Sequence, residues 1–464
     1  MAGEFDLLVL GAGSGGYACA LRAAQLGLRV GLVERDLVGG TCLHQGCIPT
    51  KAILHAAEVA DAARGGAQFG VHATIDKIDL AAVTAYAESV IGRLYKGLSS
   101  LVSSRGIEVI AGSGRLMRTE EGPGVAVGED MYTAPYVVLA TGSAPRTLPG
   151  LTVDGEHILT SQHAWRLDRL PASAVVLGGG VIGCEFASAW RSFGVEVTIV
   201  EALPRLLAAE EPAVSTALER AFRKRGITVV TGAPLESAVV ESGGVRLTVA
   251  GDRTLDAELL LVAVGRGPVS DGLGYAEAGV GLDRGFVVVD DRLRTAVPGV
   301  YAVGDLVAGL QLAHRGFAHG IFVAEDIAAR LKRTDTAPAP VIDRDIPRVT
   351  YCDPEVASVG LTEEAARAEL GEVETVIYDL TGNGRSQILR TAGFVKLVRA
   401  SNGPVVGVHM IGARVSELVG EAQLITGWDA YAEEVAAMLH AQPTQNEALG
   451  EAHLALAGKP LHRH

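Results

Sequence analysis

One stretch of the chain could carry out redox chemistry, because it places Cys42 and Cys47 five positions apart in the sequence GGTCLHQGCIPTK. In a regular helix, α-carbons five residues apart are separated by about 8–9 Å, whereas a disulfide needs them within about 7 Å. A bridge between the two cysteines therefore requires a bent backbone, which Gly46 and Pro49 permit. A strained, accessible bridge is of the kind that is reduced and re-formed. The alternative is two ordinary buried thiols.

The composition narrows the class of protein. A chain of 464 residues is too long for one hydrophobic core and predicts about three domains. The hydrophobic share of 48% and the 58 glycines are typical of an α/β protein with many loops. Five cysteines are too few for a disulfide framework. The formal charge of −14 argues against a general affinity for nucleic acid or anionic membranes.

The sequence also carries no sign of export. No basic segment followed by an apolar run opens the chain, and no apolar stretch approaches the ~18–20 residues that cross a bilayer. We therefore expect a cytoplasmic protein in a reducing compartment, with no membrane partner and no metal site. In such a compartment a disulfide is more often catalytic than structural.

The elements that must position the cysteines begin with a dinucleotide fingerprint. The apolar run 6–10 predicts a buried parallel strand, followed by the sequence GAGSGG, a helix over 17–26 and a second strand over 30–33. Gly11 suits the tight turn, Gly13 the approach of a pyrophosphate, and Gly16 close helix packing. Glu34, 23 positions after Gly11, can accept a ribose hydroxyl at the end of the second strand.

The same unit occurs a second time. Residues 174–177 lead into GGGVIG, a helix to about residue 193 and a strand over 196–200 that Glu201 closes. Both copies keep their glycines and their acid, so we expect two dinucleotides rather than one copy left idle. Glu201 would repel a 2′-phosphate, which favours NAD over NADP. We expect Arg205 to be a solvated charge rather than a phosphate contact.

Later segments are expected to complete these sites. The segments 136–143 and 259–266 each predict a strand followed by a turn, in which the strand ends beneath its nucleotide. Asp305 follows a small turn, before a helix that begins near Leu312, and is either a helix cap or a ligand to a sugar alcohol; Gly304 favours the ligand. Residues 334–340 predict a linker. No glycine fingerprint follows, which predicts a third domain with another task; its expected strands are 349–351, 393–398 and 405–411, and its expected helices are 363–369, 417–431 and 432–439.

Taken together, these motifs resemble the pyridine-nucleotide disulfide oxidoreductases, and within them the dihydrolipoamide dehydrogenases. The resemblance covers nearly the whole chain and includes LATGS, GGGVIGCE, VAVGRGP, YAVGD, PRVTYCDPEVASVGLTE and HAQPTQNEALGEAHLAL. It implies an α/β fold with two Rossmann-like nucleotide-binding domains, for FAD and NAD, and an α+β C-terminal dimerisation domain. The implied parts are an FAD domain (1–148), an NAD domain (149–276), a central segment that completes the FAD site (277–340) and a dimer-interface domain (341–464).

The resemblance also implies the binding residues. Those expected around a tightly but non-covalently bound FAD are Gly11, Gly13, Gly16, Glu34, Gly40, Thr41, Thr141, Gly142, Asp305, Ala313 and His314. Those expected around NAD are Gly178, Gly180, Gly183, Glu201 and Gly265. The expected assembly is a homodimer with sites shared across the interface.

The implied chemistry is that of sulfur. A dithiol attacks the Cys42–Cys47 disulfide, Cys42 forms the mixed disulfide, and Cys47 contacts the flavin. Lys51, with Glu185 as its ion-pair partner, stabilises the Cys47 thiolate and negative charge on reduced flavin. Electrons then pass to NAD, so that the protein supplies alignment and electrostatics.

Two positions depart from the family pattern. The family has a histidine base directly before the Pro-Thr, held by the glutamate five positions on; here Gln442 stands in that place and Glu447 remains. General base catalysis contributes roughly 10²–10⁴-fold, so dihydrolipoamide turnover should be impaired. His440 is expected to be structural. His319 stands where the family commonly has an acid; a replacement base, a flavin-tuning residue and a tolerated surface change are all open, and the last is the expectation.

Three functions are therefore compared. The first is a working NAD-linked dithiol–disulfide oxidoreductase, either a dihydrolipoamide dehydrogenase with weakened base catalysis or an enzyme that acts on another small-molecule or carrier-bound thiol. The second is a diverged flavoenzyme of a specialised pathway that oxidises a different, carrier-tethered thiol and passes electrons to O₂. The third is a non-enzymatic flavin-binding assembly component. The retained cysteines, Lys51 and Glu185 argue against the third, and the missing base argues against an unmodified first.

Overall fold

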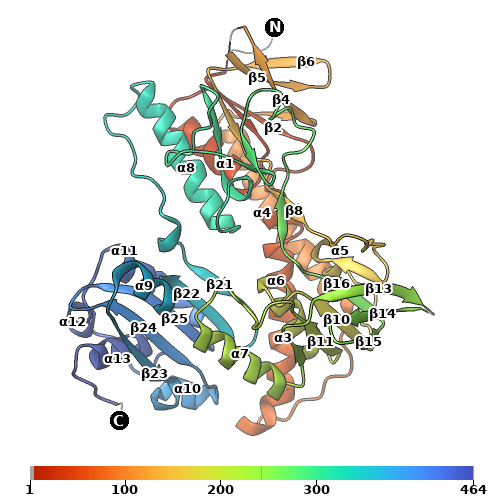
Figure 1. Cartoon of the computed structure of the whole chain (residues 1–464), viewed down its shortest axis with the longest axis vertical. Helices are drawn as coiled ribbons and strands as arrows, with labels where there is room; N and C mark the ends of the chain where they lie inside the picture. Colours follow the sequence, from red (N-terminus) through yellow and green to blue (C-terminus); the bar gives the residue numbers. More distant parts are fainter. Residues whose placement is uncertain (1–4, 121, 242, 463–464) are drawn as a thin grey trace. The chain divides into compact units, whose positions relative to one another are not determined.

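The computed structural model describes residues 5–120, 122–241 and 243–462. The chain separates into two compact units, each built from three stretches of sequence (Figure 1). The first comprises Met1–Ala52, Ala81–Arg146 and Gly265–Asp343, and the second Ile53–Leu80, Thr147–Val264 and Arg344–His464. The boundary falls within α3 (Cys47–Gly65), and α4 (Leu80–Ser104) begins the second stretch of the first unit.

A five-stranded parallel sheet forms the core of the first unit. Its order is β20 (Val300–Ala302), β7 (Tyr136–Leu139), β1 (Leu7–Leu10), β2 (Val30–Glu34) and β3 (Glu108–Ala111). Strand β1 is buried along its whole length. It has a neighbouring strand on each side and packed sheet faces, so only apolar side chains are suitable there. The strand predicted within 136–143 is β7, which pairs with β1 in parallel, so both strands end at the edge where the fingerprint turn begins.

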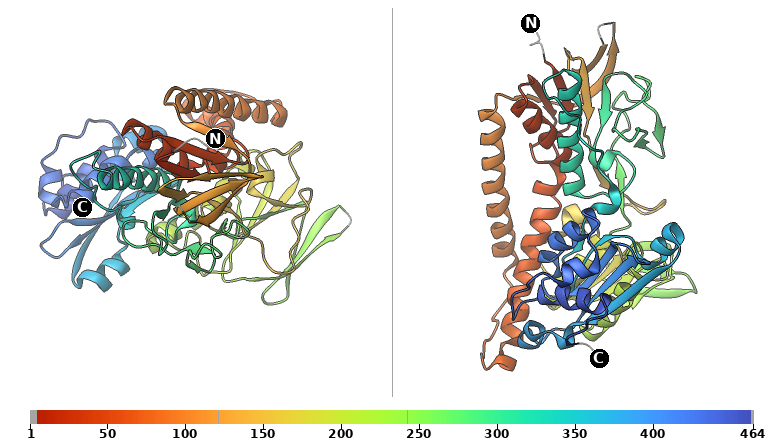
Figure 2. Two further views of the ribbon diagram at one scale, coloured as in Figure 1. Left: turned by 90° about the horizontal axis from the view of Figure 1, so that it is seen from above. Right: turned by 90° about the vertical axis from the view of Figure 1, so that its left-hand side faces the viewer.

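Helices α1 (Ser14–Gln25) and α8 (Ala313–Arg330) pack side by side on this sheet (Figure 2). Small residues allow this approach: a Cβ on Gly320 would lie 2.2 Å from the carbonyl oxygen of Gly15. The antiparallel strands β4 (Gly114–Thr119), β5 (Gly122–Val127) and β6 (Asp130–Thr133) form a second, smaller sheet of this unit. The unit also contains two short antiparallel pairs. They are β8 (Ser143–Pro145) with β17 (Arg266–Pro268), and β18 (Leu282–Asp283) with β19 (Phe286–Val287).

The second unit repeats the parallel arrangement. Its sheet has the order β12 (Thr228–Val230), β11 (Glu196–Val200), β10 (Ser173–Leu177), β16 (Leu259–Val262) and β9 (Ile158–Thr160). Helix α6 (Val181–Ser192) follows β10 as α1 follows β1. The other elements are α5 (Ser161–Ala164), α7 (Pro212–Lys224) and the antiparallel strands β13 (Leu235–Glu241), β14 (Gly244–Val249) and β15 (Arg253–Ala257).

An antiparallel sheet forms the C-terminal part of the second unit. Its order is β21 (Arg348–Thr350), β22 (Glu355–Gly360), β25 (Val405–Gly412), β24 (Phe394–Ala400) and β23 (Val373–Asp379). Its helices are α9 (Glu363–Leu370), α10 (Gly384–Leu389), α11 (Val419–Gly427), α12 (Ala432–Ala436) and α13 (Glu447–Leu456). The predicted strands over 349–351, 393–398 and 405–411 are present, whereas β22 and β23 were not anticipated. A helix predicted over 417–431 ends earlier, at Gly427.

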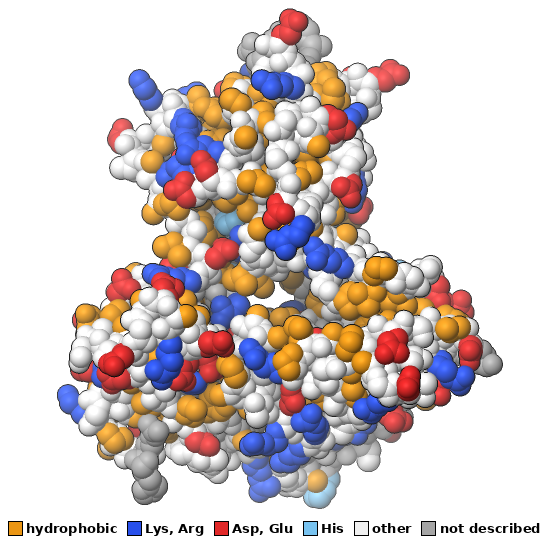
Figure 3. Space-filling model, viewed as in Figure 1, with side chains coloured by type: hydrophobic (Ala, Val, Ile, Leu, Met, Phe, Trp, Pro, Cys, Tyr) orange, Lys and Arg blue, Asp and Glu red, His pale blue; other side chains and the backbone are white. Residues whose placement is uncertain are grey.

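The predicted fold class, two Rossmann-like domains and an α+β domain, is confirmed. The four-part domain division stays a prediction. Among the described residues no helix is both long and apolar enough to cross a membrane, and no three His, Cys, Asp or Glu side chains are arranged to hold a metal ion. The negative net charge is not evenly spread: basic side chains gather over α7, where Arg220, Arg223 and Lys224 are exposed (Figure 3).

Candidate active site

The two cysteines lie on either side of a break between two helices. Cys42 is in α2 (Gly40–His44), and Cys47 is the first residue of α3. Gln45 and Gly46 separate the helices, so the predicted bend is present at Gly46. Pro49 lies in the first turn of α3, where its missing N–H would have no intrahelical partner. Both cysteines are partly exposed free thiols.

Cys42 keeps its proton more firmly than an ordinary thiol. A hydrogen bond with Cys47 raises the pKa of the Cys42 thiol most, and burial and the nearby Cys47 charge raise it further. The Lys51 cation and a hydrogen bond with Ser14 act in the opposite direction. Cys42 therefore loses its proton at a higher pH than an ordinary thiol does. Ser14, which lies within the glycine turn, was not predicted as a site residue.

The first glycine turn forms an open cradle directly beside the cysteines. Gly11 has φ +101°, and a Cβ on Gly16 would lie 1.8 Å from the carbonyl oxygen of Gly11. A Cβ on Gly13 would have no atom within 4 Å, so this glycine faces open space. A Cβ on Gly40, the first residue of α2, would lie 2.6 Å from the Gly13 α-carbon. The helix that carries Cys42 therefore begins against the cradle.

Glu34 is held in place by the same turn. Its Oε2 accepts a hydrogen bond from the Ala12 N–H at 2.7 Å, and its Oε1 accepts one from the Asp36 N–H at 2.9 Å. Each carboxylate oxygen keeps a further lone pair, so the carboxylate can still accept hydroxyl donors.

The second glycine turn has the same geometry. Oε2 of Glu201 accepts from the Gly179 N–H at 2.6 Å, and Oε1 accepts from the Leu203 N–H at 2.7 Å. A Cβ on Gly183 would lie 1.9 Å from the Gly178 carbonyl oxygen, whereas a Cβ on Gly180 would have no atom within 4 Å. This copy is therefore also built to receive a diphosphate. Arg205 is not freely solvated, because it is partly buried and donates to the Ala208 carbonyl at 2.9 Å.

Asp305 lies at the end of a chain of side-chain hydrogen bonds. Its Oδ2 accepts from the Ser143 hydroxyl at 2.5 Å, and Ser143 Oγ accepts from Nε of Arg266 at 2.7 Å. Burial lowers the pKa of Arg266, and the negative charges of Asp305 and Cys47 oppose this effect. Ser143 and Arg266 were not predicted as site residues, although both lie within the quoted motifs LATGS and VAVGRGP.

The remaining predicted nucleotide contacts occupy turns and helix ends of the first unit. The Thr141 hydroxyl donates to the Val269 carbonyl at 2.6 Å and lies 2.9 Å from the Tyr275 hydroxyl. Thr41 is the second residue of α2, Gly142 has φ +70°, and Ala313 and His314 are the first two residues of α8. Gly265 also belongs to this unit, where its carbonyl accepts from the Arg146 N–H.

Comparisons with known proteins agree with this geometry. Residues 5–320 match the model of the pyridine nucleotide-disulphide oxidoreductases, and residues 346–453 match the dimerisation domain of the same family. The chain is 41% identical to the dihydrolipoyl dehydrogenase of Chlorobaculum tepidum, over 97% of both chains. It is 37% identical to that of Bacillus subtilis, over the full length of both.

The chain belongs to the pyridine nucleotide-disulphide oxidoreductases.

Solved structures support the same fold. LpdA from Mycobacterium tuberculosis superposes with a TM-score of 0.89 at 29% identity, over 97% of this chain and 99% of that one. The HOCl-induced flavoprotein disulfide reductase RclA from Escherichia coli gives 0.86 at 23% identity, over 98% and 100%, which shows the fold alone. Oxidoreductases of this family use FAD and NAD(H), and the dimerisation domain supports a homodimer. The two open cradles and their fixed acids fit these two dinucleotides.

The family's base position is occupied by an exposed glutamine. Gln442 lies just before α13, and Glu447 is the first residue of that helix. Oε2 of Glu447 is buried and has no hydrogen-bond partner within the described part of the chain. Nearby, Nε2 of His440 lies 2.9 Å from Oε1 of Glu421, and this bond raises the pKa of His440.

Glu185 lies on α6 and is almost completely buried. Its Oε1 accepts from the Tyr351 N–H at 3.0 Å. One turn further along α6, Ser188 Oγ accepts from the Asp353 N–H at 3.0 Å. The loop after β21 therefore lies along the helix and holds the Glu185 carboxylate.

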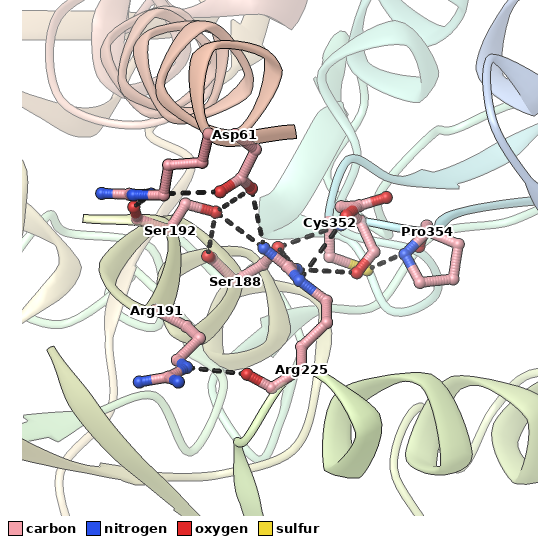
Figure 4. A network of polar contacts seen from close by, with 9 residues as sticks. Asp61, Ser188, Arg191, Ser192, Arg225, Cys352 and Pro354 are labelled. Atoms are coloured by element: carbon pink, nitrogen blue, oxygen red, sulfur yellow. Dashed lines mark hydrogen bonds and ion pairs between the residues drawn. The ribbon is translucent and has the colours of Figure 1, made fainter. Parts of the chain in front are cut away.

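A guanidinium fixes this loop to its surroundings (Figure 4). Arg225 donates from Nη1 to Ser188 Oγ at 2.7 Å and to the Asp353 carbonyl at 2.8 Å. Its Nη2 donates to Ser192 Oγ at 2.7 Å and to Asp61 at 3.1 Å. Arg225 thus joins the later part of α3, helix α6 and the loop that holds Glu185.

His319 is not on the surface, so that expectation was wrong. Only 2% of the residue is exposed, because α8 turns this side towards the sheet. Nδ1 of His319 accepts a hydrogen bond from the Gly304 N–H at 3.3 Å.

Proposed function

We propose that this flavoprotein disulfide oxidoreductase uses Cys42 and Cys47 as its redox pair and oxidises a dithiol other than dihydrolipoamide. The observation that carries the redox assignment is the pair itself: two partly exposed thiols in hydrogen-bond contact across a helix break, with Lys51 one turn beyond Cys47. Their position next to the open Gly13 cradle supports access to the family's flavin. Five free cysteines are consistent with a reducing cytoplasm.

The proposed thiol chemistry proceeds in two exchanges. The first thiolate of the substrate attacks Cys42 Sγ of the oxidised pair, which forms a mixed disulfide and releases Cys47 as a thiolate. The second substrate thiolate then displaces Cys42, which leaves an oxidised substrate disulfide, two reduced cysteines and two protons released from the substrate. Bound FAD supplies the two-electron transfer between this pair and NAD. Lys51 favours negative charge at the pair, and Glu185 is the proposed partner of Lys51.

The chain has no imidazole at the family's base position that could deprotonate the first substrate thiol. The Gln442 amide has no basic lone pair of useful strength, so a substrate thiol must lose its proton to water or arrive ionised. A substrate thiol with a lower pKa than an ordinary alkanethiol is favoured, because more of it is thiolate at neutral pH.

The two other histidines do not replace the base. The bond to Glu421 favours the charged form of His440, and a charged imidazole has no lone pair to accept a proton. The Nδ1 lone pair of His319 is taken by the Gly304 N–H, and the ring is buried. We infer that both histidines are structural with respect to the thiol reaction.

A second candidate follows from the same substitution. Because Gln442 stands where the family has its base, the second candidate is a diverged enzyme of a specialised pathway that oxidises a carrier-tethered thiol and passes electrons to O₂. In both candidates the protein is a homodimer whose sites are shared across the interface.

A steady-state screen tests these proposals. The purified dimer is mixed with dihydrolipoamide, with dithiols of lower pKa and with carrier-bound dithiols, and NADH formation and O₂ consumption are followed separately. NADH formation with a low-pKa dithiol supports the first candidate, and O₂ consumption without NADH formation supports the second. Loss of every thiol-dependent signal in Cys42→Ser confirms the redox pair; retention of activity in this variant would contradict it.

A further inference from the structure

His319 holds the backbone of the segment that carries Asp305. Its Nδ1 accepts the Gly304 N–H at 3.3 Å, and Gly304 begins the short 3₁₀ helix η2 (Gly304–Leu306). The neighbouring residue Gly320 packs α8 against α1, because any side chain there would meet the Gly15 carbonyl oxygen at 2.2 Å. The helix, and the imidazole with it, therefore has a fixed position relative to the fingerprint.

Gly304 is held at both of its backbone groups. Nη1 of Arg315, one turn before His319 on α8, donates to the Gly304 carbonyl at 3.3 Å. Arg315 is itself buried and is fixed by Asp343 at 2.7 Å and 3.0 Å. Gly304 has φ +69°, and a glycine can leave this conformation for other φ/ψ regions at little cost. The two side chains of α8 therefore supply the restraint that the glycine lacks.

The next residue, Asp305, presents its carboxylate from this restrained turn. Oδ2 accepts from the Ser143 hydroxyl at 2.5 Å, and Ser143 is bound by Arg266. Asp305 is therefore fixed from two sides: by Ser143 at its side chain, and by His319 and Arg315 through the Gly304 backbone. Loss of either restraint would allow the carboxylate to move relative to the Gly13 cradle in the same unit.

The imidazole suits this task only when it is neutral. The pKa of His319 is lowered to about 4, mainly by burial and to a smaller extent by the Arg315 cation, while Asp343 acts in the opposite direction. The neutral ring carries its proton on Nε2, which leaves Nδ1 as an acceptor for the N–H of Gly304. A protonated ring would carry a proton on Nδ1 as well, and Nδ1 could then not accept from that N–H.

We propose that His319 is a positioning residue of the FAD site, which acts through the Gly304 N–H to hold Asp305 in the conformation that binds the cofactor. The imidazole does not take part in the thiol reaction. The inference uses the proposed role of Asp305 in FAD binding and is independent of the thiol substrate and of Gln442.

The test compares two replacements of the histidine. His319→Asn keeps an acceptor at the place of Nδ1, whereas His319→Leu removes the acceptor and leaves the Gly304 N–H unpaired. Apoprotein of each variant is titrated with FAD, and binding is followed by the quenching of flavin fluorescence. We expect His319→Leu to weaken FAD binding by about 5–30-fold, the effect of one lost buried hydrogen bond, and His319→Asn to stay within about 3-fold of wild type.

Two controls separate this outcome from a general loss of structure. Ile321→Ala changes an exposed residue of the same helix and should leave FAD binding unchanged. Circular dichroism of the apoproteins shows whether His319→Leu remains folded. Equal FAD affinity of wild type and His319→Leu, or equal losses in His319→Leu and His319→Asn, would overturn the inference. Failure of wild-type apoprotein to bind FAD would instead contradict the proposed function.

Discussion

Nε2 of His440 lies 2.9 Å from Oε1 of Glu421, and this pair occupies the segment in which the family has its catalytic base. The other oxygen of Glu421 accepts from the Asn446 amide at 2.6 Å. A Cβ on Gly450 would lie 2.5 Å from the imidazole, so the ring also packs closely on α13. These contacts hold His440 in the local structure. His440 therefore does not replace the histidine base that is missing at Gln442, two residues later.

The His440–Glu421 pair should make stability depend on pH. The bond raises the pKa of His440 above 6.5, so its contribution is complete below that value and is lost as the pH rises through the raised pKa. The same bond lowers the pKa of Glu421 below 4.5, so that contribution is lost as the pH falls through the lowered pKa. We expect His440→Gln to reduce the free energy of unfolding by about 1–3 kcal/mol between these limits.

Urea denaturation at several pH values measures this effect. The matched control is His55→Gln, because His55 forms a solvent-exposed pair with Glu58. A difference between wild type and His440→Gln that stays the same from pH 5 to pH 9 would contradict an ionised pair.

Equivalent substitutions in the two fingerprints should each affect the binding of a different cofactor. Gly13→Ala and Gly180→Ala each place a methyl group in open space, so both proteins should fold normally. We expect Gly13→Ala to lose FAD while it stays folded. Gly180→Ala should keep its flavin but raise the KM for NADH, because the methyl group meets the incoming diphosphate.

Alanine at the third glycine of each turn should act differently. At Gly16 and Gly183 the methyl group would lie 1.8 Å and 1.9 Å from a backbone oxygen, so these variants should be unstable even without cofactor. Flavin absorbance and thermal unfolding of the four variants distinguish the two effects. A normal KM for NADH in Gly180→Ala would show that the second turn does not hold NAD.

Removal of Cys47 should make Cys42 more acidic. The hydrogen bond with Cys47 is the largest cause that raises the pKa of Cys42, and burial would remain in Cys47→Ala. We expect alkylation of Cys42 by iodoacetamide to begin at lower pH in Cys47→Ala than in the reduced wild type. Peptide mass spectrometry identifies the alkylated residue, and Cys352→Ala serves as the control. Unchanged pH dependence would mean that the two thiols do not interact.

Loss of Arg225 should destabilise the second unit. Its guanidinium donates to Ser188, Ser192, Asp61 and the Asp353 carbonyl (Figure 4). We expect Arg225→Met to lower the free energy of unfolding by about 2–4 kcal/mol, since several buried acceptors lose a charged donor. Arg223→Met, two residues earlier in α7, is the matched control; Arg223 is largely exposed, and loss of its pair with Glu219 should change stability by less than about 0.5 kcal/mol. Similar losses in the two variants would contradict the role of Arg225.

Local patterns predicted the nucleotide cradles well. A glycine turn between a buried strand and a helix specifies its own geometry, so Gly11–Glu34 and Gly178–Glu201 could be placed from spacing alone. The bend between the cysteines was also predictable, because five residues of regular helix cannot bring two sulfurs together.

Contacts between distant segments were not predictable in the same way. His319 meets Gly304, and Arg225 meets Asp61 and Asp353, only because the fold packs their elements together. Exposure of a single polar residue on a helix also has no clear sequence signal, which is why His319 was expected on the surface. Strand β22 was also missed; five of its six residues are buried, so it lacks the alternation of buried and exposed residues that marks a half-buried strand.

The most direct test of the central claim is the turnover of dihydrolipoamide with NAD by wild type and by Gln442→His. We expect a flavin that NADH reduces in both proteins, slow turnover in wild type, and a gain of about 10²-fold or more in kcat/KM for Gln442→His, at the lower end of the range for general base catalysis. Glu447→Gln in the Gln442→His background should remove most of that gain. Turnover by wild type at the rate of an ordinary dihydrolipoyl dehydrogenase, unchanged in Gln442→His, would contradict the account.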